Sequence, residues 1–400
     1  MSSISRRLFL HFAGSTLATL GLNQFNISQQ AQRYGKVLAQ STPRKVALLV
    51  GINKYSGQPL RGCVNDLDLQ RYLLIHRFGF NPKDIYILTD EKATRQGILD
   101  GFEEYLIKQV KPGDVVVYHY SGHGSLINDP NPIITEAGSK KAGLNGTFVP
   151  IDSNLPPGYP EQGGVVKDIM GHTLFLLMSA IKSDNLTVVL DSCYSGGATR
   201  DSRRRARDSG EKILISPEEK SYQEQWLSRL KWSHEEFVRR YRAGVAKGVV
   251  LAATNPEQTA MDYRFNGFDA GLFTYKLTQY LWQASGTPDS AISSVNQQIQ
   301  KENVFQTPRY DVKLDSGYEQ EPIYFINKPS PVANGVVSEV TGNRGKLWLG
   351  GVDLGMVDKG TVFTVINGAG RLIFQSRNGL VGEAIVEGNV KEGMLLKQVN

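Results

Sequence analysis

The sequence predicts an α/β protein with a mainly parallel six-stranded sheet, followed by a small β-rich domain. Short, strongly apolar runs alternate with segments whose apolar residues recur at helical spacing. The apolar runs lack internal polar alternation, as expected for parallel strands covered by helices on both faces. Residues 335–400 hold 13 of the 41 glycines among further short apolar runs, a pattern typical of short strands joined by turns.

Strands and helices are expected in strict alternation up to about residue 327. Six strands are predicted, at residues 46–50, 84–88, 115–120, 187–190, 248–252 and 322–326. Five helices are predicted, at residues 65–77, 94–109, 172–181, 272–283 and 291–301. The first helix opens with Asn65 and Asp66, residue types that favour helix N-termini. Residues 328–331 read as a linker, and residues 335–400 as the Gly-rich β domain.

Composition excludes several classes of protein. With 400 residues, 40% hydrophobic and 21% charged, the chain is neither collagen-like nor wholly disordered. The formal charge is +6, but residues 1–39 contribute four cations and no acid, which leaves only +2 for the rest. This weak basic balance predicts no nucleic-acid partner. Two cysteines, Cys63 and Cys193, exclude a disulfide framework.

The N-terminal segment has the features of an export signal. Arg6 and Arg7 precede a modestly apolar stretch, residues 12–22, that glycine and threonine interrupt. This resembles a twin-arginine signal, with cleavage expected after Ala39 and export of the folded protein to a periplasm or thylakoid lumen. An uncleaved membrane anchor and a chance arginine pair are the alternatives. The stretch is too short and polar to span a bilayer, and no later run qualifies.

Two predicted strands each run into a reactive residue framed by glycine. The strand at 115–120 continues into Ser121-Gly122-His123-Gly124, and the strand at 187–190 continues into Asp191-Ser192-Cys193-Tyr194-Ser195-Gly196. Because the carboxyl ends of parallel strands meet at one edge of a sheet, the imidazole and the thiol should lie together.

This pair has the chemistry of a nucleophile and its base. A free thiol is only slightly ionised at neutral pH, and a neighbouring imidazole corrects this by accepting its proton. We therefore expect Cys193 to be the nucleophile and His123 the general base and acid. The backbone N–H groups of Gly124 and Cys193 are the expected oxyanion-hole donors. Taken singly, a buried cysteine or histidine is more often structural.

At these motifs the sequence resembles the caspase-like cysteine peptidases of clan CD (peptidase C14), specifically the metacaspases and their bacterial relatives, the orthocaspases. The resemblance covers residues 45–327 and implies a caspase-like α/β/α sandwich from a bacterial source. Within it, residues 45–200 are large-subunit-like, residues 201–247 a basic linker or insertion, and residues 248–327 small-subunit-like. It also implies a monomeric cysteine endopeptidase that works through a thioester acyl-enzyme.

The resemblance further implies the substrate. In metacaspases an acidic primary pocket accepts Arg or Lys, and the matching positions here are Cys63, Asp66, Ser121 and Asp191. Carboxylates form bidentate bonds with a guanidinium and repel an acidic side chain. Peptides or proteins cleaved after Arg or Lys, and not after Asp, are therefore the expected substrates. A helix N-terminal charge at Asp66 and a structural carboxylate at Asp191 remain alternatives.

Residues 200–207 contain five arginines, so we expect a solvated, exposed loop there. In a peptidase that cleaves after Arg, such a loop is a candidate for self-cleavage. The candidate positions are Arg203, Arg204, Arg205 and Arg207. A plain insertion without function is the alternative.

No cofactor is required by this chemistry, and calcium is left as a candidate activator. Many metacaspases use Ca²⁺, and Asp152 and Asp168 lie in the corresponding region. The sequence has no compact run of carboxylates, however, and Arg200 stands where a further acid is expected, so no metal ligand is assigned. Two other functions stay open: a caspase-like scaffold or binding protein with little activity, and a Cys-His acyl transferase or ligase.

Overall fold

The computed structural model describes residues 43–133, 143–159, 161–193, 204–207, 212–255 and 258–399. Lys45–Asn400 forms one compact unit. The predicted export signal lies outside the described residues. Within those residues, no helix has both the length and the apolar character needed to cross a membrane.

A six-stranded sheet forms the centre of the unit, as predicted. The strand order is β13-β10-β8-β3-β1-β2, and all neighbours are parallel except β13, which is antiparallel to β10. The strands are β1 (Lys45–Gly51), β2 (Ile85–Thr89), β3 (Val115–Ser121), β8 (Leu186–Asp191), β10 (Gly244–Ala252) and β13 (Arg309–Lys313). The inner strands β1, β3 and β8 are buried almost throughout, which explains their unbroken apolar runs.

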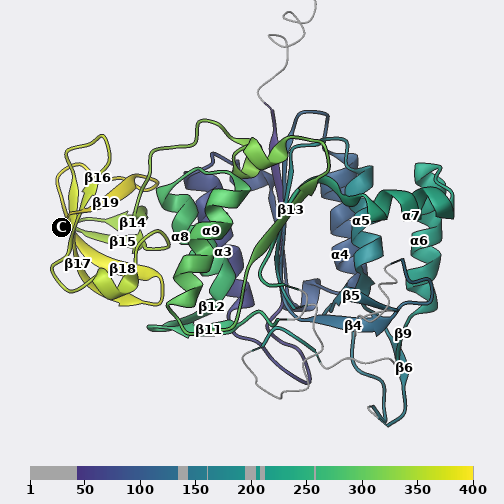
Figure 1. The fold of residues 1–400 in the computed structure, drawn as a ribbon. Coiled ribbons are helices and arrows are strands. Elements are labelled where there is room, and N and C mark those ends of the chain that lie inside the picture. Colours follow the sequence, from purple (N-terminus) through teal and green to yellow (C-terminus); the bar gives the residue numbers. More distant parts are fainter. Residues whose placement is uncertain are drawn as a thin grey trace, which may run out of the picture. The chain divides into compact units, whose positions relative to one another are not determined.

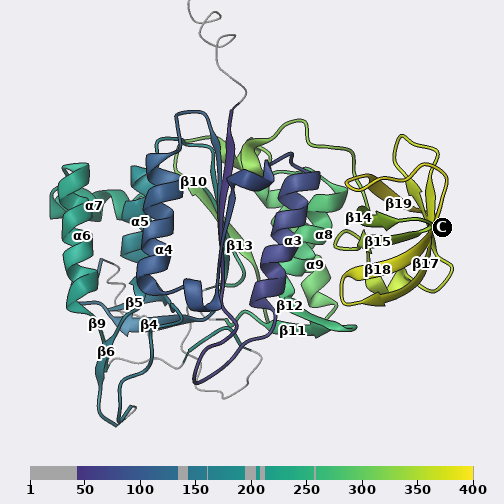
Figure 2. The ribbon, with the colours of Figure 1, turned by 180° about the vertical axis from the view of Figure 1, so that it is seen from behind.

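Helices cover both faces of this sheet (Figures 1 and 2). One face carries α3 (Cys63–His76), α8 (Leu272–Gln283) and α9 (Pro288–Gln300). The other carries α4 (Arg95–Gly101), its π-helical continuation η4 (Phe102–Lys108), α5 (Gly171–Ala180), α6 (Pro217–Leu230) and α7 (His234–Arg242). Sequence signals set several helix starts: Ser216 and Thr287 cap α6 and α9, each of which has proline in its first turn.

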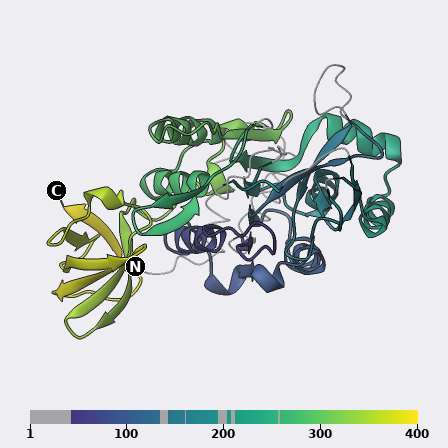
Figure 3. The ribbon, with the colours of Figure 1, turned by 90° about the horizontal axis from the view of Figure 1, so that it is seen from below.

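Shorter strands gather at one end of the sheet (Figures 1 and 3). A five-stranded sheet has the order β6-β9-β4-β5-β7, and a hairpin pairs β11 with β12. Their bounds are β4 (Gly124–Asn128), β5 (Leu144–Phe148), β6 (Gly164–Val166), β7 (Ile169–Met170), β9 (Ile213–Ile215), β11 (Asp262–Phe265) and β12 (Phe268–Gly271). Because β4 follows directly from β3, this end is the one where His123 lies. The remaining short helices of this part are η2 (Pro82–Asp84), η3 (Asp90–Lys92), η5 (Tyr318–Gln320) and η6 (Ile323–Phe325).

The predicted sixth strand at residues 322–326 is wrong. That apolar run forms the short helix η6, in which Tyr324 and Phe325 have positive φ values of 64° and 53°, and a β-strand cannot contain that conformation. The sixth strand is β13 instead. It was missed because its side chains are only half-buried at the edge of the sheet, so its sequence, Arg-Tyr-Asp-Val-Lys, has no apolar run.

Strict alternation is also wrong. The five-stranded sheet interrupts it after β3, and α6 and α7 lie within residues 201–247, predicted as a basic linker or insertion, where no helix was expected. These helices are strongly charged, and few of their residues are buried, chiefly Trp226 and Phe237. Their high charge suggested a loop, although the caps at Ser216 and Ser233 marked helix starts.

The C-terminal β-rich domain is a closed barrel with the order β14-β15-β18-β17-β16-β19. Its elements are β14 (Gly335–Thr341), β15 (Arg344–Trp348), η7 (Leu354–Met356), β16 (Val362–Val365), β17 (Arg371–Asn378), β18 (Val381–Glu387) and β19 (Leu395–Val399). The ring of Trp348 stacks on Tyr72 of α3 at 4.2 Å. Gln283 of α8 donates to the carbonyls of Ala333 and Gly351. The barrel therefore packs directly on the helical layer of α3 and α8.

Candidate active site

His123 and Cys193 lie beyond the carboxyl ends of two neighbouring parallel strands. The last residues of β3 and β8, Ser121 and Asp191, are partners in the strand register. His123 comes two positions after Ser121, and Cys193 comes two positions after Asp191. The strand register therefore brings both reactive residues to the same edge of the sheet. Both are buried, at 2% and 0% exposure.

A segment of the chain's own arginine-rich run, residues 204–207, lies across this edge. The carbonyl oxygen of Arg205 accepts hydrogen bonds from the backbone N–H groups of Gly124 (3.0 Å) and Cys193 (3.2 Å). On one side Arg204 forms an antiparallel bridge with Met261, and on the other Ala206 forms a parallel bridge with Gly124. The two N–H groups predicted as oxyanion-hole donors therefore converge on one peptide carbonyl, that of Arg205.

The side chain of Arg205 is completely buried among three carboxylates. Its Nη1 lies 2.7 Å from Asp66 and 3.3 Å from Asp191, and its Nη2 lies 3.0 Å from Asp262. Nη1 also donates to Ser121 Oγ at 3.2 Å. Burial raises the pKa of Asp66 above its usual value although Arg205 stands beside it. Such a cluster of acids is stable in the interior only with a cation among them.

Neighbouring groups orient these carboxylates. Asp66 accepts from Gly271 N–H (2.8 Å) and Ser121 Oγ (2.8 Å), and Asp191 accepts from the N–H and hydroxyl of Thr274. Gly271 also makes room for the guanidinium, because a Cβ there would lie 2.2 Å from Asp191 Oδ2 and 2.7 Å from Arg205 Nη1. The geometry is therefore that of an acidic pocket that holds one planar cation, the guanidinium of Arg205.

A carbonyl group fixes the His123 imidazole. Its Nε2 lies 2.6 Å from the Gln58 carbonyl oxygen, which can only accept, so Nε2 carries the proton and Nδ1 is left with a free lone pair. Nδ1 is buried and has no hydrogen-bond partner among the described residues. Burial lowers the pKa of His123 to about 4. The ring is therefore neutral and able to accept a proton through Nδ1.

The Cys193 thiol is equally enclosed. Its Sγ accepts a hydrogen bond from Ala260 N–H at 2.8 Å, and burial raises its pKa to about 12. With residues 204–207 in place, thiol and imidazole are thus both uncharged. A second glycine is essential to this arrangement: a Cβ at Gly124 would lie 1.7 Å from the Cys193 carbonyl oxygen.

The other predicted site residues are Cys63 and the arginines proposed for self-cleavage. Cys63, the fourth predicted pocket residue, is buried at the first position of α3, where its N–H donates to the Asn53 side chain. Burial raises the pKa of its thiol, and the charge of Arg205 acts in the opposite direction. Arg203 lies outside the described residues, whereas Arg204, Arg205 and Arg207 lie within them.

The expectation of a solvated, exposed loop is wrong for Arg205 and Arg207. Arg205 is 0% exposed and Arg207 is 7% exposed. The physical reason is that each arginine has a buried carboxylate as partner, so a run that looks like surface by composition is held in the interior.

The acids considered for calcium have other partners. Asp152 accepts from Arg95 N–H at the start of α4, and Asp168 pairs with Arg207 at 2.7 Å. Across the described parts of the chain, no three His, Cys, Asp or Glu side chains form a cluster that could hold a metal ion.

Three residues that the sequence analysis missed contribute to this geometry: Asp262, Gly271 and Gln58. Asp262 is the third carboxylate of the pocket, and it also accepts from the N–H groups of Arg61 and Gly62. It begins β11, far from either motif in the sequence, and no local pattern marks it. Gln58 acts through its backbone carbonyl, so its residue type carries no signal.

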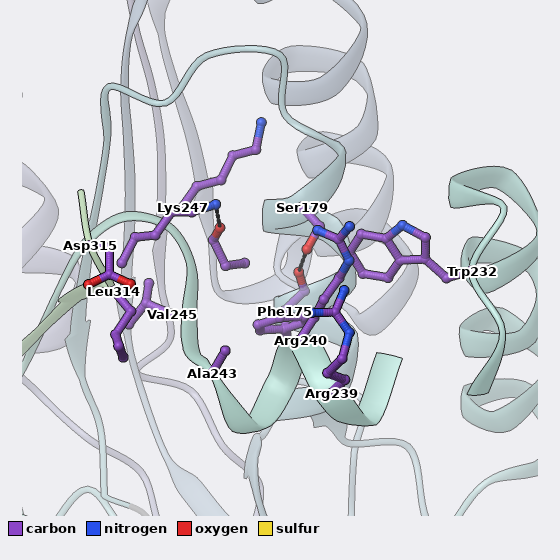
Figure 4. A pocket seen from close by; sticks show the side chains of 12 residues that line it. Phe175, Ser179, Trp232, Arg239, Arg240, Ala243, Val245, Lys247, Leu314 and Asp315 are labelled. Carbon is purple, nitrogen blue, oxygen red and sulfur yellow. Dashed lines mark hydrogen bonds between the residues drawn. The ribbon is translucent and has the colours of Figure 1, made fainter. Parts of the chain in front are cut away.

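A hollow of about 330 Å³ lies near the start of β10, the end of the sheet opposite to Cys193. Figure 4 shows the side chains that line it. It is lined by Val245 and Lys247 near the start of β10, and by Arg239, Arg240 and Trp232. Arg239 and Arg240 both pair with Glu236. Because Cys193 lies beyond the carboxyl end of β8, this hollow is separate from the site described above.

The fold and the strand-end pair of histidine and cysteine define a caspase-type cysteine peptidase. The model of the caspase domain, peptidase family C14, matches residues 44–330, and the chain belongs to this family. Metacaspase-1 of Meyerozyma guilliermondii is 34% identical over 185 residues, covering 43% of this chain and 42% of that protein. Metacaspase-1 of Yarrowia lipolytica is 34% identical over 175 residues, covering 42% of this chain and 34% of that protein.

The chain thus spans less than half the length of these curated relatives. A solved structure of a Geobacter sulfurreducens protein covers 72% of this chain and 100% of its own, at 18% identity and a TM-score of 0.48. That likeness is too distant to support an argument about function.

Proposed function

We propose that this protein is a cysteine endopeptidase that cleaves after Arg or Lys, and that it processes itself after Arg205. One observation carries the proposal. Arg205 has its side chain among Asp66, Asp191 and Asp262, while its carbonyl oxygen accepts from Gly124 and Cys193 N–H. This is how a substrate residue on the acyl side of a cleaved bond must be bound.

In the proposed reaction the Cys193 thiol gives its proton to His123 Nδ1, and Sγ adds to the substrate carbonyl carbon. The resulting oxyanion is stabilised by the N–H groups of Gly124 and Cys193. His123 then returns the proton to the leaving amine, the C–N bond breaks, and a thioester remains. Water, deprotonated by His123, hydrolyses the thioester to a carboxylate and restores the thiol.

Charge decides the specificity. A pocket with three buried carboxylates accepts a guanidinium or ammonium group and repels an acidic side chain. Arg is expected to be preferred over Lys because its planar, forked group reaches carboxylates on two sides, as Arg205 does with Nη1 and Nη2.

Self-processing also accounts for the buried state of the dyad. Residues 204–207 lie across the cleft and block it to other substrates, and burial keeps Cys193 and His123 uncharged. The unprocessed chain is accordingly a precursor. Cleavage between Arg205 and Ala206 frees the cleft for other substrates.

The test uses purified full-length chain and its Cys193→Ala variant with fluorogenic peptides that end in Arg, Lys, citrulline or Asp. Citrulline is the matched control, because it has nearly the shape of Arg without its charge. We expect turnover of the Arg and Lys peptides by wild type only. Cleavage after Asp, or equal rates for Arg and citrulline, contradicts the pocket assignment. Activity that survives in Cys193→Ala contradicts the nucleophile.

Product analysis separates hydrolysis from the acyl transfer left open by the sequence. Peptide joined to an added amine nucleophile, instead of a free carboxylate, indicates a transferase or ligase. If no peptide is turned over and the chain is never processed, the scaffold function is favoured.

We further propose that residues 1–39 direct export to a periplasm or thylakoid lumen and that the processed protein acts as a monomer. Fractionation of bacterial cells that express the full chain, beside an Arg6→Lys and Arg7→Lys double variant, tests the signal. Export predicts a mature N-terminus at Gln40, lost in the variant. Size-exclusion chromatography tests the monomer.

Calcium activation stays a proposal without assigned ligands. The rate of self-processing, measured with added Ca²⁺ and with a chelator, tests it. No step of the reaction above passes through the ion.

A further inference from the structure

Arg207, two residues after Arg205, has a buried acidic environment of its own. Its Nη2 lies 2.7 Å from Asp168 Oδ2. Its Nη1 donates to the Ser153 carbonyl at 3.1 Å and to Ser153 Oγ at 3.3 Å, and Nη2 also lies 3.4 Å from Ser125 Oγ. An arginine that only filled a surface loop would not be bound by four oxygen atoms in the interior.

The Asp168 carboxylate is fixed independently of Arg207. Thr147 Oγ1 and Ser153 Oγ each donate to it at 2.6 Å, one to each oxygen. Asp168 is 1% exposed. Hydroxyl groups orient the carboxylate but do not neutralise it, so Arg207 supplies the opposing charge. We call Asp168, Ser153, Thr147 and Ser125 the Asp168 subsite.

The backbone links this subsite to the cleft in a fixed register. Gly124 N–H donates to the Arg205 carbonyl at 3.0 Å, and the Gly124 carbonyl accepts from Arg207 N–H at 2.9 Å. Gly124 therefore holds the residues on both sides of Ala206. Ser125 and Thr147 belong to β4 and β5, so the small sheet at the end of the strands carries the subsite.

We propose that the Asp168 subsite selects an Arg or Lys side chain two residues after the cleaved bond. The proposal rests on the proposed function, because it takes the Arg205–Ala206 bond as the one cleaved. When residues 204–207 leave, Asp168 loses its cation and remains buried with hydroxyl partners only. A buried carboxylate in that state is costly, and a basic side chain of the incoming substrate restores the pair. Asp168 is thus a specificity residue of the leaving side and takes no part in bond breaking.

The test compares two internally quenched peptides that share one Arg before the cleaved bond and Ala after it. They differ only two residues after the bond, where one has Arg and the other citrulline. The enzyme is the processed chain with Arg207→Gln, so that its own arginine does not compete for the subsite. Mass spectrometry of the products restricts the rates to cleavage before Ala.

We expect kcat/KM for the Arg peptide to exceed that for the citrulline peptide by on the order of 10- to 100-fold, the range for a buried charge-assisted contact. Adding Asp168→Asn, which keeps the shape and can still accept from one of the two hydroxyls through its amide oxygen, should bring this ratio to about 1. A ratio near 1 in the Arg207→Gln enzyme, or one that Asp168→Asn leaves unchanged, overturns the proposal.

A third peptide keeps the test decisive if Asp168→Asn fails to fold. It moves the second Arg one position further from the cleaved bond. The advantage should be lost; if it persists, general attraction of basic peptides explains it and the subsite does not. A wrong proposed function would give another result. Peptides with Arg and with citrulline directly before the bond would then be cleaved equally slowly, whatever residue follows the bond.

Discussion

Replacing Arg205 with Gln tests whether self-cleavage depends on the side chain of Arg205 in the acidic pocket. The alternative is that any arginine of the nearby arginine-rich run is cleaved because it lies close to Cys193. The change removes a cation that lies within 3.3 Å of three carboxylates and has no exposed surface. Loss of one partner from a buried, hydrogen-bonded charge cluster costs about 4 kcal/mol. At 1.36 kcal/mol per factor of ten, self-cleavage should slow by about 10³-fold.

The assay follows the full-length chain by intact mass and N-terminal sequencing, with the fragment that begins at Ala206 as readout. Arg204→Gln is the matched control. It removes the same charge one residue earlier, where the structure gives a backbone bridge to Met261, and its rate should stay within about twofold. Arg205→Lys keeps the charge without the fork and should lose about tenfold. Wild-type rates in Arg205→Gln, or a block in Arg204→Gln instead, would refute the assignment of Arg205 to the pocket.

Three further outcomes follow from the site. Burial lowers the pKa of His123 from 6.5 to about 4, so its contribution to stability is complete above pH 6.5 and is lost as the pH falls towards 4. In the uncleavable Cys193→Ala chain the free energy of unfolding in urea should drop by about 2 kcal/mol from this group between pH 7.5 and 5. His123→Gln should remove that part of the drop and leave the part due to other histidines whose pKa burial also lowers, namely His76, His119 and His172. An unchanged pH dependence would show that His123 is not buried as described. Iodoacetamide should label Cys193 slowly in the unprocessed chain, because burial raises the pKa of its thiol to about 12. Labelling should be at least tenfold faster in Arg205→Glu, because the introduced carboxylate is repelled by the acidic pocket and residues 204–207 leave the cleft. Equal labelling of the two chains, mapped by peptide mass, would contradict a closed cleft. Asp262→Asn should lower kcat/KM of the processed enzyme for Arg peptides on the order of 10- to 100-fold, and an undiminished rate would limit the pocket to two acids.

The position of the reactive pair was predictable because parallel strands impose a simple rule. His123 and Cys193 each follow a strongly apolar run of the sequence, and residues at the carboxyl ends of neighbouring strands must meet. Ser121 and Asp191 lie within the same motifs, whereas Asp66 was expected only from the resemblance to metacaspases, and all three contact Arg205. The motifs at the strand ends thus locate Ser121 and Asp191, two of the four side chains that contact the Arg205 guanidinium.

The other parts of the site, and the edge strand of the sheet, depend on tertiary contacts that no local sequence pattern encodes. Asp262 contributes to the pocket through the hairpin of β11 and β12, whose placement is set by tertiary packing. The composition of residues 200–207 predicted that Arg205 and Arg207 are solvated. Composition shows how polar a segment is, but it does not show that Asp66 and Asp168 pair with these arginines in the interior. The edge strand β13 shows the same limit, because half-buried charged residues leave no periodic signal.

The stacking of Trp348 on Tyr72 has a consequence for any attempt to shorten the protein. The helix that carries Tyr72 begins at Cys63 and also holds Asp66, so one rigid element touches the barrel at one end and Arg205 at the other. Leu73 and Trp282 share a single apolar cluster with Leu347 and Leu396 of the barrel. The family match ends at residue 330, but the hydrophobic core does not. A chain cut at that boundary would expose the outer side of α3 and α8 to water, so we expect it to be less stable than a chain that keeps the barrel.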